Sequence, residues 1–183
     1  MRELALHLLD IAENSVSAQA QNITIIVEEY TSRNRLRMSV EDDGVGMTPE
    51  MVARVVDPFV TSRSTRKVGL GLPFLKQAAE ACNGFLQIHS TPAKGTQVEV
   101  EFQLDHIDRM PLGDLAGTFL SLLIANPSIN WIFDYRVNEK QFIFESAPIV
   151  KELEGIMLSE PVVLAFLREQ LQTGVAEIPE PLS

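Results

Sequence analysis

The chain has 183 residues, of which 45% are hydrophobic and 22% charged, a balance that excludes a disordered chain and indicates a folded, soluble protein. Its formal net charge of −10 disfavours nucleic acid as a partner, because like charges repel. No apolar stretch approaches the roughly 20 residues that a membrane span needs. Since Cys82 is the only cysteine and the N-terminus carries no secretory signal, we expect a cytoplasmic protein without membrane attachment.

The first element that the sequence predicts is an amphipathic helix over residues 2–18. Apolar and small residues recur at helical spacing on one stripe, at Leu4, Leu8, Ile11, Ser15 and Ala18. A second stripe carries His7, Asp10 and Asn14, which therefore point in one direction. His7 could orient Asp10 or could be a surface histidine without a task. The second stripe is polar enough to suggest a site.

Alternating apolar and polar residues predict strands over residues 23–28 and 35–41. Thr48 and Pro49 then predict the start of a short helix that ends near residue 56. After a polar loop over 58–72, a further helix begins at Pro73 and ends before Asn83 and Gly84.

Two more strands are predicted near residues 86–88 and 98–104, separated by a turn at 92–95. The outward positions of the last strand are all polar, at Gln97, Glu99, Glu101 and Gln103. One face of the sheet is therefore expected to lie open to water, with helices on the other. This is the α+β class, arranged as a two-layer α/β sandwich.

Residues 105–183 have a different pattern, with predicted helices near 112–125, 149–155 and 161–172 and strands near 131–137 and 141–145. This part is acidic, with five basic and twelve acidic residues. We expect residues 1–104 to form one domain and residues 105–183 a small, separate α+β extension. Its abundant apolar residues predict either a self-contained core or an exposed patch around Trp131 and Phe133 for self-association or for a partner. The last ten residues are expected to form a loose tail.

Five short motifs stand in order along residues 1–104. They are Asp10-x-x-x-Asn14, Asp42-Asp43-Gly44-Val45-Gly46, the segment from Asp57 to Arg63, Val68-Gly69-Leu70-Gly71-Leu72, and Gly95-Thr96. Each alone is a weak signal, but together and in this order they resemble the superfamily of gyrase, heat-shock chaperone, histidine kinase and mismatch-repair ATPases. The resemblance is to the ATP-binding domain of histidine kinases and implies the Bergerat fold.

The resemblance places the adenine of ATP at Asp42. This carboxylate follows a strand and can accept a hydrogen from the N6 amine of adenine, a contact that guanine cannot offer. The glycines after it, Gly44 and Gly46, allow a flat ring to approach the backbone. Thr96 is implied to support the same end of the base, through water. The alternative interpretation of Asp42 is an ordinary turn aspartate.

Asn14 offers an amide oxygen to a hard cation, which suits a Mg²⁺ ion held mainly by water and phosphate oxygens. The alternative is an asparagine that faces solvent on a helix surface. Its position on one stripe with Asp10 favours the metal site.

The triphosphate is expected at the Gly69-Leu70-Gly71 turn, where glycines allow close approach and a helix N-terminus favours anions. The resemblance assigns Thr61, Arg63 and Lys67 to the same ligand, in a lid over residues 58–72 that ATP orders. The basic residues of this loop would help to neutralise phosphate charge. An ordinary basic surface cluster is the alternative for each of them.

Asp10 is the candidate general base. Relatives that hydrolyse ATP or phosphorylate serine commonly have Glu at this place, so the shorter Asp puts its reach in question, and Glu13 is a substitute candidate. Two functions remain open. One is a protein kinase or slow ATPase that acts with a protein partner or substrate. The other is a regulatory module without catalysis, whose ATP lid captures a partner.

No helical hairpin with a phosphoacceptor histidine precedes the predicted ATP-binding helix, so we do not expect a complete histidine kinase in this sequence. A homodimer is one option for its assembly, and the acidic extension has no counterpart in the kinase pattern. Fold analogy alone does not choose between catalysis and regulation.

Overall fold

The computed structural model describes residues 3–57 and 71–178. The helices and strands follow one another as α1 (Leu4–Ser17), β1 (Asn22–Tyr30), β2 (Arg35–Asp42), α2 (Pro49–Val55), α3 (Gly71–Ala81), β3 (Phe85–Thr91), β4 (Gly95–Gln103), α4 (Leu115–Ala125), β5 (Asn130–Val137), β6 (Lys140–Glu145), α5 (Ser146–Glu152) and α6 (Pro161–Ala176). No helix within the described ranges is long and apolar enough to cross a membrane.

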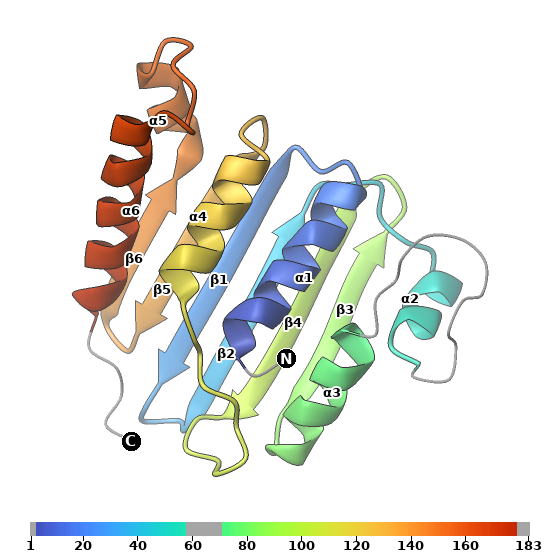
Figure 1. Ribbon diagram of the computed structural model, residues 1–183. Coiled ribbons are helices and arrows are strands. Elements are labelled where there is room, and N and C mark those ends of the chain that lie inside the picture. Colours follow the sequence, from blue (N-terminus) through green and yellow to red (C-terminus); the bar gives the residue numbers. More distant parts are fainter. Residues whose placement is uncertain (1–2, 58–70, 179–183) are drawn as a thin grey trace.

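The described strands form one six-stranded sheet in the order β3-β4-β2-β1-β5-β6 (Figure 1). Neighbouring strands are antiparallel except β1 and β5, which are parallel. The register places Ile25 of β1 opposite Val40 on one side and Phe133 on the other. Apolar residues therefore lie side by side across strands on one face, as the alternating patterns predict.

Helices α1, α3, α4 and α6 cover this apolar face (Figure 1). The result is the two-layer sandwich predicted from the sequence. The short helix α2 begins where the sequence predicts, because the Thr48 side chain accepts a hydrogen bond from the backbone N–H of Met51 at 3.4 Å.

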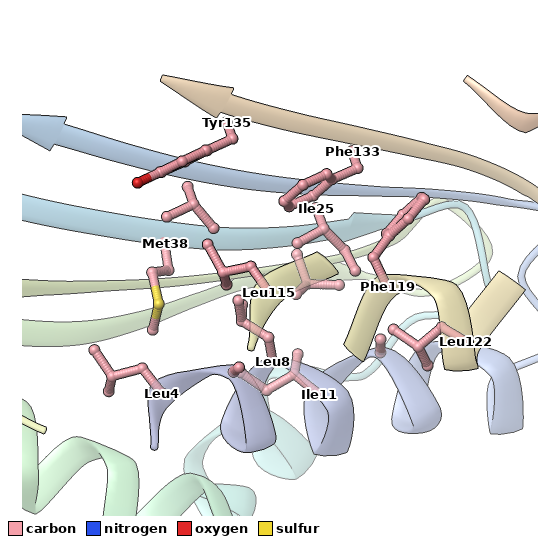
Figure 2. Packing of buried hydrophobic residues seen from close by; sticks show 14 of the residues in the cluster. Leu4, Leu8, Ile11, Ile25, Met38, Leu115, Phe119, Leu122, Phe133 and Tyr135 are labelled. Carbon is pink, nitrogen blue, oxygen red and sulfur yellow. The ribbon is translucent and has the colours of Figure 1, made fainter. Parts of the chain in front are cut away.

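The apolar stripe of α1 lies at the centre of the core. Figure 2 shows Leu4, Leu8 and Ile11 pointing from this helix toward the sheet and toward Leu115 of α4. All three α1 residues are nearly or fully buried. Because one stripe of α1 is fixed in this way, the orientation of its other stripe is fixed as well.

The opposite face of the sheet carries paired charges. Arg37 of β2 lies 2.6 Å from Glu99 of β4 and 3.6 Å from Glu28 of β1. Arg136 of β5 lies 3.0 Å from the same Glu28 and also pairs with Asp134. These cross-strand ion pairs satisfy the charges of a face that no described helix covers, as expected for an open sheet face.

The extension is not the separate unit that we expect from its sequence. Strand β5 pairs with β1 along residues 130–137, so the extension widens the sheet of the first 104 residues. Helix α4 packs against both α1 and α6. Trp131 and Phe133 are buried, which contradicts the predicted patch at these residues. The physical reason is that the free edge of β1 supplies the apolar surface and hydrogen-bond partners that a unit of this size lacks alone.

The segment before α4 also completes α1. Glu3 precedes α1 without a side-chain cap, and the backbone N–H groups of Leu4 and Ala5 instead donate to the carbonyls of Pro111 and Leu112, at 2.9 and 2.8 Å. Helix ends leave such N–H groups without partners inside the helix. The connection to the extension therefore stabilises the first turn of α1.

Some predicted boundaries differ from the observed ones. Helix α3 already includes Gly71 and Leu72, two residues before the predicted start at Pro73. Helix α6 continues to Ala176, so residues 174–176 belong to a helix and not to the predicted tail. Gly174 allows this last turn to pack on β6, since a Cβ there would lie 2.1 Å from the ring of Phe142.

Because sheet and core are continuous, the first 104 residues and the extension should unfold together. Phe119 of α4 stacks on Phe133 at 4.9 Å, so Phe119→Ala should lower the free energy of unfolding by about 3–5 kcal/mol. In urea titrations, fluorescence of Trp131, the only tryptophan, and far-ultraviolet circular dichroism should then report one shared transition. Two separate transitions would show that the extension folds independently.

Candidate functional site

Two hollows are found at the predicted site, one along the polar stripe of α1 and one at the end of β2. The first has a volume of about 220 Å³ and is lined by His7, Asp10, Ile11, Glu13, Asn14, Ser17, Gly71, Leu72 and Leu75. The second has a volume of about 310 Å³ and is lined by Glu41, Asp42, His89, Ser90, Thr91, Lys94, Gly95, Thr96 and Gln97. Five of the predicted ATP, metal and base residues, Asp10, Asn14, Gly71, Asp42 and Thr96, line these two hollows.

The carboxylate of Asp42 is held from two sides. Its Oδ2 accepts a hydrogen bond from the Ser15 hydroxyl of α1 at 2.5 Å, and its Oδ1 accepts from the backbone N–H of Gly44 at 2.9 Å. Each carboxylate oxygen has a second lone pair that neither bond uses. Asp42 is thus a fixed acceptor at the end of a central strand.

The next residue, Asp43, has a structural role. It accepts hydrogen bonds from the backbone N–H groups of Gln21 and Asn22 and from the Asn22 side chain, at 2.7 to 2.9 Å. Burial acts to raise the pKa of Asp43, but these hydrogen bonds outweigh it and leave the pKa below its ordinary value. Asp43 ties the start of β1 to the end of β2 and so positions Asp42.

Thr96 lies opposite Asp42 in the register of β2 and β4. Its hydroxyl is 2.8 Å from that of Ser90 on β3, which also donates to the carbonyl of Gly95 and accepts from the N–H of Met47. Ser90 of β3 therefore connects β4 with the loop that follows Asp42.

The glycines after Asp42 are required by the packing of the loop in which they lie. A Cβ at Gly44 would lie 2.7 Å from the carbonyl oxygen of Ala18, and one at Gly46 would lie 2.0 Å from that of Thr91. Gly46 also has a φ of +68°, which favours glycine. Close packing of the loop on α1 and β3 thus requires both glycines, and their contact with adenine stays a prediction.

Asp10 and Asn14 both line the first hollow, as their spacing predicts. Neither side chain forms a hydrogen bond with a described residue, so both are available to a ligand. Gly71, the first residue of α3, lies beside Asp10, because a Cβ there would come within 3.0 Å of Asp10 Oδ2. A carboxylate, an amide and the start of a helix therefore meet in one hollow.

His7 differs from the surface histidine that we considered from the sequence. It is only 4% exposed, and its Nδ1 has no hydrogen-bond partner among the described residues. Burial lowers the pKa of His7, while the nearby charge of Asp10 acts in the opposite direction. The imidazole is therefore held in its neutral form beside Asp10.

The remaining predicted contacts, Thr61, Arg63, Lys67, Gly69 and Leu70, lie outside the described residues, as does most of the predicted lid. Within the described ranges, no group of three or more His, Cys, Asp or Glu side chains could hold a metal ion. The metal ligand predicted at Asn14, with phosphate and water as the other ligands, stays a prediction.

Sequence reasoning missed two residues of the site, Ser15 and Ser90. Ser15 occupies the apolar stripe of α1 and was grouped with the packing residues, yet it is 4% exposed and bonded to Asp42. A hydroxyl on a buried stripe needs a partner, which was a usable signal. Ser90 has no such signal, since only the pairing of β3 with β4 brings it to Thr96.

The structure is thus a two-layer α/β sandwich with polar hollows at α1 and at the end of β2. The family described as "Histidine kinase-, DNA gyrase B-, and HSP90-like ATPase" matches residues 1–106, and the chain belongs to this ATP-binding family.

Curated relatives include "Sensor protein kinase FleS" of Pseudomonas aeruginosa, 39% identical over 89 residues, which are 49% of this chain and 22% of that protein. A "Putative sensor protein" of Shewanella frigidimarina is 30% identical over 109 residues, 59% of this chain and 16% of that protein. The chain thus spans less than a quarter of the length of either relative.

Among solved structures, the "N terminal domain of a DNA repair protein" is similar with a TM-score of 0.54 and 17% identity. The similarity covers 78% of this chain and 52% of that chain. This share is larger than residues 1–106 alone make up, so the likeness in fold continues into the extension.

The buried His7 predicts how stability depends on pH. Its pKa in the folded chain is below the ordinary value of 6.5, so the unfolded chain binds more protons as the pH falls below that value. The free energy of unfolding should therefore decrease below about pH 6.5 and be unaffected by His7 above it. Urea titrations at pH 7.5 and 5.5 should show a smaller decrease for His7→Leu than for the wild type. The exposed His89 provides the control, since His89→Gln should lose as much unfolding free energy between pH 7.5 and 5.5 as the wild type. An equal loss in all three proteins would contradict the assignment to His7.

Proposed function

We propose that this chain binds ATP with Mg²⁺ in the two hollows and transfers the γ-phosphoryl group to a protein partner or, slowly, to water. The observation that carries the proposal is the carboxylate of Asp42, fixed by Ser15 and Gly44 in one hollow while Asp10 and Asn14 line the other. Membership of an ATP-binding family supports it. Because the chain spans only a part of its sensor-kinase relatives, the transfer itself is a proposal for this chain.

The carboxylate acceptor of Asp42 fits the N6 amine of adenine. Two hydrogen bonds keep the carboxylate in place, so it can accept from the N6 amine without moving. The hydroxyl of Thr96 lies on the neighbouring strand and would support the base through water. Gly44 and Gly46 hold the loop close to this position. Guanine carries an oxygen where adenine carries the amine, so Asp42 would repel it.

The first hollow fits a phosphate chain with its metal ion. Asn14 would give its amide oxygen to Mg²⁺, whose other ligands would be phosphate oxygens and water. The start of α3 at Gly71 would offer backbone N–H groups to the phosphates. Thr61, Arg63, Lys67, Gly69 and Leu70 complete the proposed set of phosphate contacts from the chain between α2 and α3.

Asp10 is the proposed general base. Its carboxylate has no described hydrogen-bond partner and shares the hollow with Asn14, so it would accept the proton from an attacking water or hydroxyl group. The acceptor substrate is proposed to be a protein, either a second copy of the chain or a heterologous partner.

Asp42→Asn tests the nucleotide site. An asparagine loses the charge and can accept with only one oxygen, so ATP binding should weaken by about 1.5–3 kcal/mol in calorimetry. The preference for ATP over GTP should shrink at the same time. Glu139→Gln, which removes a charge from the exposed turn before β6, should leave both unchanged. Unaltered ATP affinity of Asp42→Asn would reject the adenine assignment.

Asp10→Asn separates chemistry from binding. It leaves Asn14 and Asp42 in place, so ATP affinity should hold while release of ADP or labelling of a partner falls roughly 10²-fold or more. Glu13→Gln, a change on the same helix, should retain wild-type turnover. If Glu13→Gln lost turnover and Asp10→Asn retained it, Glu13 would be the general base. Wild-type protein that binds ATP but neither releases ADP nor labels a protein in a lysate would instead establish the regulatory module.

A further inference from the structure

An exposed apolar surface lies at the start of α6, far along the sheet from the proposed nucleotide site. It consists of Ile156 and Met157, just before the helix, and Val162 and Phe166 in its first turns, and we call these four residues the α6 patch. Between 50 and 82% of each of these side chains is exposed. Exposed apolar residues that cluster in this way are typical of binding surfaces.

The α6 patch is not needed for the core of the domain. Helix α6 packs on the sheet and on α4 through Val163, Leu167 and Leu171, all buried. Val162 and Phe166 are four residues apart and lie on another side of the helix. Figure 1 shows α6 as the outermost helix of its layer, with α5 and the connecting loop at the end where α6 begins. A partner helix can therefore lie alongside α6 without displacing any described element.

Four exposed glutamates are close to the α6 patch in the chain, and we call them the rim. They are Glu152, Glu154, Glu160 and Glu169. None of them forms an ion pair with a described residue, and Arg168 is the only basic residue between the first and the last of them. Lys151 lies directly before Glu152, so four acidic side chains stand against two basic ones and the rim has an excess of negative charge beside an apolar centre.

This combination points to one occupant. We propose that the α6 patch binds a basic amphipathic helix of another protein, with its apolar face on Val162 and Phe166 and its Lys or Arg side chains on the rim glutamates. A second copy of this chain fits poorly, because a two-fold contact would bring the glutamates of both copies together. This proposal goes beyond ATP binding and does not depend on it.

The probe for a binding test is a fluorescein-labelled helical peptide of Leu and Lys in amphipathic order, measured by fluorescence anisotropy with the full chain. A second peptide has Glu in place of every Lys. The Lys peptide should bind, and added salt should weaken its binding because salt screens the rim charges. The Glu peptide should bind at least about tenfold more weakly, on the scale of a few charge pairs.

Variants of the chain locate the site. The double substitution Val162→Gln with Phe166→Gln should weaken binding of the Lys peptide about tenfold or more, as expected for anchors at a contact centre. The double substitution Glu160→Gln with Glu169→Gln should weaken it and reduce its salt dependence. Ile107→Gln, at a side chain that is 95% exposed in the connection between β4 and α4, is the matched control and should bind like the wild type.

Three outcomes would overturn the proposal. The first is equal binding of the Lys and Glu peptides, and the second is unchanged affinity in the Val162 and Phe166 double variant. The third is a wild-type dimer in light scattering that this double variant abolishes, which would make a second copy the occupant. Each variant is also titrated with ATP, whose affinity should stay at the wild-type value because the two hollows lie beside α1, α3 and β4. Loss of peptide binding with intact ATP binding thus separates this proposal from the proposed function.

Discussion

The packing of α1 on the sheet is the constraint on which the structure depends. One stripe of this helix is buried against β1, β2 and α4, and a helix that buries one stripe has no freedom left to rotate the others. Asp10 and Asn14 consequently face the start of α3. The hydrogen bond from Ser15 to Asp42 joins the same helix to the end of β2. The packing of α1 therefore positions side chains of both hollows relative to one another.

The extension stabilises this arrangement from the other side. Pro111 and Leu112 accept the first N–H groups of α1, α4 packs against it, and β5 extends the sheet beyond β1. Without these contacts, β1 would present an unpaired edge and α1 an exposed apolar side. The extension is thus part of the scaffold of the proposed ATP-binding site, although every proposed nucleotide contact precedes it in the chain.

Charge is distributed differently over the two surfaces of the molecule. On the open face of the sheet, Arg37 and Arg136 pair with carboxylates from neighbouring strands, so this face is polar but locally balanced. Around the start of α6 the glutamates have no such partners. These four rim glutamates, among the twelve acidic residues of 105–183, lie close in the chain to exposed apolar groups, and a basic partner would neutralise them.

The sequence alone determined the elements of residues 1–104, the open polar face, and the grouping of Asp10 with Asn14, because periodicity and turn residues are local properties. It also determined the family, through motifs in a fixed order. Only the tertiary structure decided that Trp131 and Phe133 are buried, that Ser15 and Ser90 belong to the site, and that His7 is enclosed. Each of these depends on which strand or helix lies next to which. The parallel pairing of β1 with β5 joins residues about a hundred positions apart in the chain, and no local pattern records such a contact.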